Sequence, residues 1–406
     1  MYKHFDKSFF AGNRTKLRTV CNEDAPIIIA ANGRMQKSAD VAFSFQQDSN
    51  FWYLAGINEP DATLVIDVDE TYLIAPEKTD YLSYFYGQLQ GGDDAQISGI
   101  ENIYTADEGW QKVAKRIKKT NKAYSLTPPP DYIDVYGMYT NPTRKVVVEK
   151  LQNIAPKIEI IDARQDLALL RMTKQPGEIA ALQEAVDLTV KAFTQVSSGS
   201  YKTEKEIEAA FSMFFLQHDQ HEHAYDPIVA AGKNACLMHT SSTRQAMQQN
   251  QLVLMDIGAS VDGYAADITR MITIGKPTSR QTEVYDAVLA VQKFALGNIK
   301  PGISIRENEK LVEQFMGEQM IKLGIIKKPE RESIRHYFPH ATSHFLGRDV
   351  HDLGDYDQPL APNMVLTIEP GIYIPEENIG VRIEDDIIVT KDGCRIMSDA
   401  LPRTLK

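Results

Sequence analysis

The first part of the chain alternates short apolar runs with segments of helical periodicity. Residues 63–68 and 71–75 are rich in β-branched side chains and are separated by two acidic residues, which predicts a β-hairpin. Other apolar runs predict further strands, and apolar positions three or four apart predict helices. The pattern indicates a mixed α/β domain. Its further strands are expected at 26–31, 123–126 and 158–161, and its helices around 113–117 and 145–154.

From Gln175 onward the pattern changes to long amphipathic helices. Residues 203–206 and 304–307 both read as capping boxes, with Thr or Ser followed three residues later by Glu, and each predicts a helix start. Two hairpins that contain acidic residues lie between and after these helices. This order indicates a duplicated ααββ unit. We therefore expect an α/β (α+β) protein with two domains, 1–168 and 169–406.

The first of these hairpins is centred on Asp262-Gly263, a strong turn signal between the strand-like runs 253–257 and 264–271. Its arms contain Asp256 and Asp267, and their midpoint falls within about one residue of the turn, so we expect the two carboxylates to lie nearly opposite each other on one face, with Cβ atoms about 5 Å apart. Two like charges at such a distance share a proton or bind a cation. The alternative is a solvated pair of unrelated acids.

The second hairpin, 364–389, repeats this arrangement. The midpoint between Glu369 and Glu384 falls inside the expected turn at 375–378, so these carboxylates should also face each other. Two acid pairs centred on turns are much less probable by chance than one. The repetition favours a site built from both hairpins.

Histidines are concentrated between the two hairpins. The stretch HATSHFLGRDVHD, 340–352, contains His340, His344 and His351, three of the nine histidines in the chain. A lone histidine is usually a surface or core residue, but this grouping weakens that interpretation. Four carboxylates with one imidazole form an oxygen-rich set that suits two hard or borderline divalent ions rather than one structural zinc.

Composition limits the classes of function. With 406 residues, two or three domains are expected, and 55 acidic against 44 basic residues give a net charge of −11, which argues against a nucleic-acid surface. The three cysteines show no paired spacing, which fits a reducing compartment. No signal peptide or membrane span is evident, so we expect a cytoplasmic protein with no membrane partner.

Four stretches taken together, DIGASVDGYAADITR (256–270), HATSHFLGRDVHD (340–352), TIEPGIYI (367–374) and GVRIEDD (380–386), resemble the pita-bread metallopeptidases. The resemblance is specifically to the Xaa-Pro aminopeptidases, known as aminopeptidase P. It extends to QQDSNFWYLAGINEP at 46–60, similar to that family's N-terminal domain, and to YDPIVAAGKNACLMHT at 225–240. The resemblance implies a C-terminal pita-bread domain that hydrolyses the N-terminal Xaa-Pro bond of peptides through a metal-bridging hydroxide.

The resemblance also implies residue roles. Asp256 would hold one metal, Asp267 and Glu384 would bridge both, and His344 and Glu369 would hold the second. The ions would be two divalent cations per subunit, with Mn(II) expected and Co(II) or Zn(II) as alternatives. Glu369 would serve as general base and acid. The remaining matched positions are His239 and His351 as catalytic histidines, His340, Tyr373 and Arg382 around the substrate and carboxylates, and Phe85 and Tyr86 in an aromatic wall.

Asp40 matches an aspartate that reaches a neighbouring subunit's site in oligomeric relatives, which implies a homodimer or homotetramer. Ala341, Arg348 and Thr240 depart from the family's usual residues, and Arg348 could replace a substrate-binding arginine. Two other functions stay open. One is a prolidase, which cleaves Xaa-Pro dipeptides with the same ligands, and the other is an inactive pita-bread module used for binding, although all five ligand residues are present.

Overall fold

The computed structural model describes residues 2–21, 24–86, 96–128, 134, 136–218 and 222–405. The chain forms two compact units, Met1–Leu170 and Arg171–Lys406. Among the described helices, none combines the length and apolar character needed to cross a lipid bilayer.

The first unit is built on a six-stranded sheet in the order β6-β5-β4-β1-β7-β8. Strand β4 runs antiparallel to both neighbours, and the pairs β1–β7, β7–β8 and β5–β6 are parallel. The expected hairpin is confirmed as β4–β5, which the Asp67 N–H closes onto the carbonyl of Glu70 at 2.8 Å. The strands are β1 (Ile27–Ala30), β4 (Thr63–Ile66), β5 (Thr71–Ile74), β6 (Asn102–Tyr104), β7 (Lys122–Ser125) and β8 (Glu159–Asp162).

Strand β1 shows why this sheet is covered on both faces. Ile27 and Ile29 enter one apolar core, whereas Ile28 and Ala30 enter another, as the two-residue period of a strand requires. A separate short hairpin is formed by β2 (Gln36–Ser38) and β3 (Val41–Ala42). The helices are α1 (Lys7–Val20), α2 (Ser49–Ala55), α3 (Asp80–Tyr86), α5 (Ala106–Thr120), α7 (Thr143–Ile154) and α8 (Arg164–Met172).

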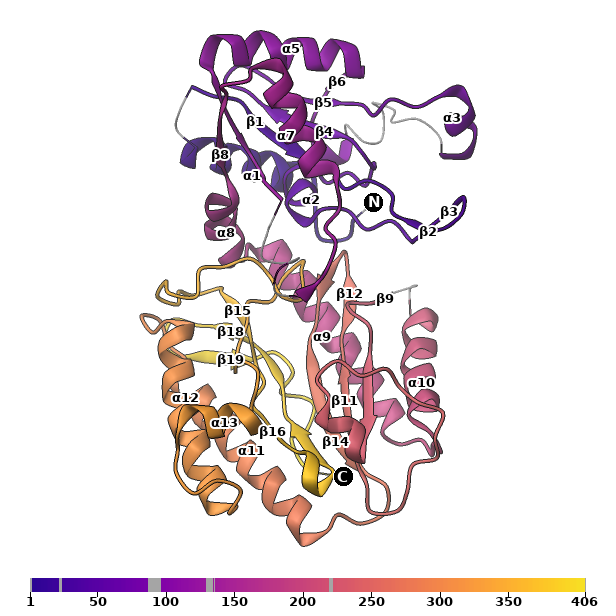
Figure 1. The fold of residues 1–406 in the computed structure, drawn as a ribbon, viewed down its shortest axis with the longest axis vertical. Helices are drawn as coiled ribbons and strands as arrows, with labels where there is room; N and C mark the ends of the chain where they lie inside the picture. Colours follow the sequence, from indigo (N-terminus) through magenta and orange to yellow (C-terminus); the bar gives the residue numbers. More distant parts are fainter. Residues whose placement is uncertain are drawn as a thin grey trace. The chain divides into compact units, whose positions relative to one another are not determined.

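The second unit contains the same order of helices followed by strand hairpins in each of its two halves, which confirms the duplicated pita-bread architecture (Figure 1). The first half contains α9 (Pro176–Val196), α10 (Glu204–Gln217), β9 (Glu222–His223), β10 (Ile228–Ala231), the 3₁₀ helix η1 (Gly232–Cys236), β11 (Leu252–Ile257), β12 (Ala259–Val261), β13 (Tyr264–Ala265) and β14 (Ile268–Thr273). The second half contains α11 (Ser279–Asn298), α12 (Ile305–Lys322), α13 (Arg331–Tyr337), β15 (Val365–Ile368), β16 (Gly371–Ile374), η2 (Pro375–Glu377), β17 (Ile379–Arg382), β18 (Asp385–Val389) and β19 (Cys394–Ile396).

Helices α12 and α10 begin at side-chain caps. Ser304 and Glu307 form the full reciprocal box, with the Ser304 N–H donating to Glu307 Oε2 at 2.8 Å. At α10 the Thr203 hydroxyl accepts from the Glu206 N–H, but the Glu206 carboxylate accepts from the N–H of Lys202. The predicted box at Thr203 is therefore only half formed, because the Glu206 side chain reaches one residue further back.

Candidate metal centre

The first hairpin turns at Asp262-Gly263, as predicted, with positive φ angles of 50° and 81°. Its register places Asp256 opposite Thr269. Asp267 lies two residues before Thr269, so it shares a face with Asp256 diagonally. The predicted direct opposition of Asp256 and Asp267 is therefore wrong by two residues, because pairing is symmetric about 262/263 rather than about the midpoint of the two acids.

Gly258 shows how tightly the arms approach near this pair. A Cβ at Gly258 would lie 1.8 Å from the carbonyl oxygen of Ala266, so only glycine fits there. The chain passes from β11 to β12 at this position. The close approach keeps Asp267, the next residue after Ala266, on the wall of the site.

The second hairpin has the register that the sequence predicts. Ile368 pairs with Asp385 on one side of the acids and Gly371 pairs with Arg382 on the other, which sets Glu369 opposite Glu384. The acids themselves lie in the gap between the β15–β18 ladder and the β16–β17 ladder. Outside the ladders, the Glu369 N–H donates to the Thr342 carbonyl at 2.8 Å and the Glu384 N–H donates to the Thr269 carbonyl at 3.2 Å.

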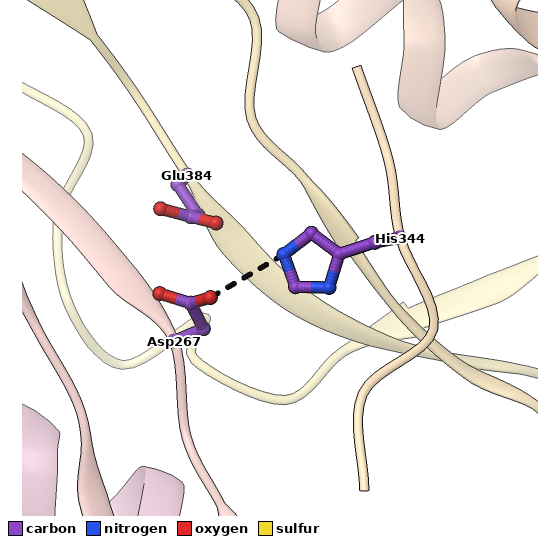
Figure 2. A group of neighbouring side chains, drawn as sticks. All are labelled: Asp267, His344 and Glu384. Carbon is purple, nitrogen blue, oxygen red and sulfur yellow. Dashed lines mark ion pairs between the residues drawn. The ribbon is translucent and has the colours of Figure 1, made fainter. Parts of the chain in front are cut away.

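Both hairpins and the histidine segment meet in one cluster. Ligand atoms of Asp267, His344 and Glu384 lie within 4.8 Å of one another, and Figure 2 shows these three side chains facing one another. His344 Nε2 lies 3.4 Å from Asp267 Oδ2 and 3.3 Å from Glu369 Oε1. Asp256 joins through a tyrosine: the Tyr225 hydroxyl is 2.5 Å from Asp256 Oδ1 and 2.6 Å from Asp267 Oδ1.

The orientation of His344 is set by its backbone neighbour. Nδ1 lies 3.0 Å from the Phe345 carbonyl oxygen and donates to it, which leaves Nε2 to face the carboxylates. Burial lowers the pKa of His344, but the hydrogen bond to Asp267 and the charge of Glu369 outweigh burial and raise this pKa to about 9. In the metal-free protein the imidazolium therefore balances part of the negative charge.

The negative charges of the clustered carboxylates are only partly balanced by neighbouring positive charges. Burial, together with the neighbouring acids, raises the pKa of Glu369 to about 7 and that of Asp256 to about 6. Burial also raises the pKa of Glu384 well above its ordinary value. Burial acts in the same direction on Asp267, but hydrogen bonding to His344 and the charge of that imidazole lower its pKa overall. Four acids and one imidazole in this pocket fit divalent cations, whose charge would relieve the repulsion.

Arg382 connects the cluster to a second histidine. Its guanidinium contacts Asp256 Oδ2 through Nη2, donates from Nε to Thr269 Oγ1 at 3.1 Å, and donates from Nη1 to the Tyr373 hydroxyl at 3.0 Å. Tyr373 in turn lies 2.8 Å from His340 Nε2. Burial and the charge of Arg382 lower the pKa of His340 to about 3, so this ring is neutral. Its Nε2 accepts a hydrogen bond from the Tyr373 hydroxyl.

The other candidate residues lie in different places. His351 packs edge-on against His344, with ring centroids 4.4 Å apart, and burial with the His344 charge lowers its pKa to about 4. His239 is exposed in the loop that follows η1. In the first unit, Asp40 is exposed between β2 and β3, and Phe85 is exposed in α3. The side chain of Tyr86 lies outside the described residues.

Three residues of the site were not identified by sequence reasoning, namely Tyr225, Thr269 and Asp386. Thr269 donates its hydroxyl proton to Glu384 Oε2 at 2.6 Å, and Asp386 accepts the N–H of Asp267 at 3.0 Å. Thr269 could have been found as the register partner of Asp256, and Asp386 as a third consecutive acid in an apolar strand. Tyr225 opens the family-like stretch 225–240, which is the signal that could have identified it. Of the family departures, Arg348 donates to the carbonyl of Asp262 at 2.9 Å, at the first turn.

Comparison with known proteins agrees with this geometry. The model of metallopeptidase family M24 matches residues 180–391, and that of the aminopeptidase P N-terminal domain matches residues 10–124. The Xaa-Pro aminopeptidase of Escherichia coli is 34% identical over 90% of this chain and 88% of its own length. Human Xaa-Pro aminopeptidase 3 is 31% identical over 94% of this chain and 80% of its own length.

Solved structures give the same result. The low-pH form of E. coli aminopeptidase P is similar with a TM-score of 0.85 at 30% identity, covering 98% of this chain and 96% of the other. A zinc-substituted form of that enzyme with product has a TM-score of 0.86 at 29% identity over the same shares of the two chains. The chain therefore belongs to metallopeptidase family M24, as a metal-dependent hydrolase of its Xaa-Pro aminopeptidase (aminopeptidase P) group.

Proposed function

We propose that this protein removes the first residue from peptides whose second residue is proline, using two divalent ions held by the cluster. Asp256 would hold one ion, His344 and Glu369 the other, and Asp267 and Glu384 would be shared. The observation that carries the proposal is the cluster in which Asp267, Glu369 and Glu384 lie around His344, with Asp256 linked to Asp267 through the Tyr225 hydroxyl. Manganese(II) suits such an oxygen-rich set, with cobalt(II) and zinc(II) as alternatives.

When bound, the two ions would supply a bridging hydroxide near neutral pH and polarise the scissile carbonyl. Side chains of the protein would then transfer the protons. Glu369, whose Oε1 lies 3.3 Å from His344 Nε2, is suited by its position to take a proton and return it to the leaving nitrogen. His351, beside His344, and His239 would contact the substrate carbonyl as it becomes tetrahedral. Hydrogen bonds from Arg382 to Tyr373 and between Tyr373 and His340 would fix the orientation of these three side chains.

The preference for proline would come from the walls rather than from the ions. An Xaa-Pro amide has no N–H, and the ring fixes φ near about −65°, so a rigid pocket can accept it with little loss of entropy. We also propose that Asp40 serves a neighbouring copy in a homodimer or homotetramer, as the family resemblance implies.

The decisive assay compares kcat/KM for Ala-Pro-Ala, Ala-Pro and Ala-Ala-Ala under saturating manganese(II). The tripeptide with proline should be the best substrate, at least about tenfold above Ala-Ala-Ala, which corresponds to about 1.4 kcal/mol of discrimination. Preference for the dipeptide would move the assignment to a prolidase. Cleavage of none of the three by the metal-loaded protein would favour an inactive binding module.

A further inference from the structure

Glu204 is a buried carboxylate with no cation among the partners that the structure gives it. It is the first residue of α10, it is only 2% exposed, and all its contacts are N–H donors. Oε1 accepts from the N–H of Ala231 at 2.7 Å and from Asn234 Nδ2 at 2.9 Å, and Oε2 accepts from the N–H of Thr243 at 2.7 Å. Burying a carboxylate costs free energy unless hydrogen bonds compensate for the lost water, so Glu204 depends on these three donors.

The donors mark the two ends of one loop. Ala231 is the last residue of β10, whose first residue, Ile228, pairs with Asp256 of the metal cluster. Thr243 lies at the far end of the loop, beside the N-terminus of α10, where its carbonyl accepts from the N–H of Lys205 at 3.1 Å. The loop tip between these anchors contains His239, which is exposed. One carboxylate therefore closes the loop that presents His239.

The beginning of the loop is anchored independently. Helix η1 packs on β17, where a Cβ at Gly380 would lie 2.1 Å from the carbonyl oxygen of Ala235. The remaining part of the loop is 237–243. Glu204 accepts a hydrogen bond from the N–H of Thr243, the last residue of that segment.

We propose that Glu204 is a positioning residue that holds His239 at the catalytic centre by bonding both ends of its loop. The inference rests on the proposed function, because His239 acts on substrate only there. The hydrogen-bond partners that the structure gives Glu204 are Ala231, Asn234 and Thr243, and none of these is a proposed metal ligand. The effect of Glu204 on turnover should therefore pass entirely through His239.

The variant Glu204→Gln tests this with little change of shape. Its amide oxygen can still accept from Ala231, but its NH₂ group faces the N–H of Thr243, donor against donor. The matched control is Glu206→Gln on the same helix, where an exposed carboxylate accepts one N–H, from Lys202, and the amide oxygen can still accept it. Asn234→Asp is a second disturbance from the loop side, since it sets a carboxylate against Glu204.

We expect Glu204→Gln and Asn234→Asp to lower kcat on Ala-Pro-Ala by about tenfold to a hundredfold, the loss typical of a misplaced catalytic group, with Glu206→Gln unchanged. In a double-mutant cycle, Glu204→Gln should add less than about twofold to the loss in His239→Ala, but should add fully to the loss in His351→Ala. Bound manganese per chain should stay at the wild-type value. Full additivity with His239→Ala, or loss of metal, would overturn the proposal.

Hydrogen exchange separates this inference from the proposed function. In Glu204→Gln, peptides covering 231–243 should exchange at least about tenfold faster than in the wild type, while the hairpins 252–273 and 365–389 keep their protection. If metal-loaded wild type cleaves no peptide, the proposed function fails, and exchange still decides whether Glu204 closes the loop. Unchanged exchange in 231–243 would refute the positioning role whatever the activity.

Discussion

Replacing Tyr225 by phenylalanine removes one oxygen atom from the edge of the cluster of carboxylates around His344. The hydroxyl lies 2.5 Å from Asp256 Oδ1 and 2.6 Å from Asp267 Oδ1, and burial with the charges of both acids raises its pKa well above the ordinary value. It therefore stays protonated and offers a single proton to two carboxylates. The ring of phenylalanine fills the same space, so packing is preserved.

The size of the effect follows from these contacts. A hydrogen bond to a charged group contributes about 1.5–3 kcal/mol, and losing a group that orients metal ligands typically costs about 10–100-fold in affinity, or about 1.4–2.8 kcal/mol. The two estimates agree. We expect Tyr225→Phe to weaken manganese(II) binding by about 10–100-fold.

The assay is a titration with buffered free manganese(II), followed by calorimetry and by cleavage of Ala-Pro-Ala. Tyr285→Phe is the control, since Tyr285 is 3% exposed and its hydroxyl has no hydrogen-bond partner among the described residues. That variant should bind metal like the wild type. Manganese affinity of Tyr225→Phe within threefold of wild type would refute the reasoning.

Three further predictions concern the same cluster. Glu369→Gln should lower kcat by about 10²–10⁴-fold with the fold intact, whereas Glu376→Gln, an exposed acid on the same hairpin, should not, and near-wild-type turnover of the former would exclude Glu369 as the base. Exhaustive chelation should abolish activity and lower the melting temperature, manganese(II) or cobalt(II) should restore both, and full activity of protein shown metal-free by elemental analysis would exclude a metal mechanism. Because the folded pKa of His344 is raised to about 9, its protonation stabilises the metal-free protein below its unfolded pKa of about 6.5, and this contribution is lost as pH rises through 9. Urea denaturation should therefore show falling stability of metal-free protein between pH 7 and 9, and a flat profile there would contradict the charge assignment.

The sequence identifies elements and acids better than it identifies their partners. The second hairpin was predicted in register because Glu369 and Glu384 are symmetric about their turn. Asp256 and Asp267 are not symmetric about theirs, and a midpoint argument cannot detect a two-residue offset when the turn signal is also two residues long. The β4–β5 hairpin was found because its two strands are adjacent in the chain.

Contacts between distant segments explain the rest. Tyr225 contacts both aspartates from outside the hairpin, and although it opens the family-like stretch 225–240, no local pattern predicts these two contacts. The sequence places Glu204 only at a predicted helix start. The three N–H groups that donate to its carboxylate belong to Ala231, Asn234 and Thr243, further along the chain. Local patterns cannot report such bonds, because they depend on how the elements pack.

The seam between the two halves of the second unit has a consequence for folding kinetics. The halves join where the Glu384 N–H donates to the Thr269 carbonyl at 3.2 Å and Arg270 Nη1 donates to the Glu384 carbonyl at 2.6 Å. These contacts close a long stretch of chain, so we expect them to form late in folding. A metal ion bound across the seam would therefore be expected to slow unfolding rather than to speed folding, so the kinetic stability of the protein should depend on metal as well as on its core.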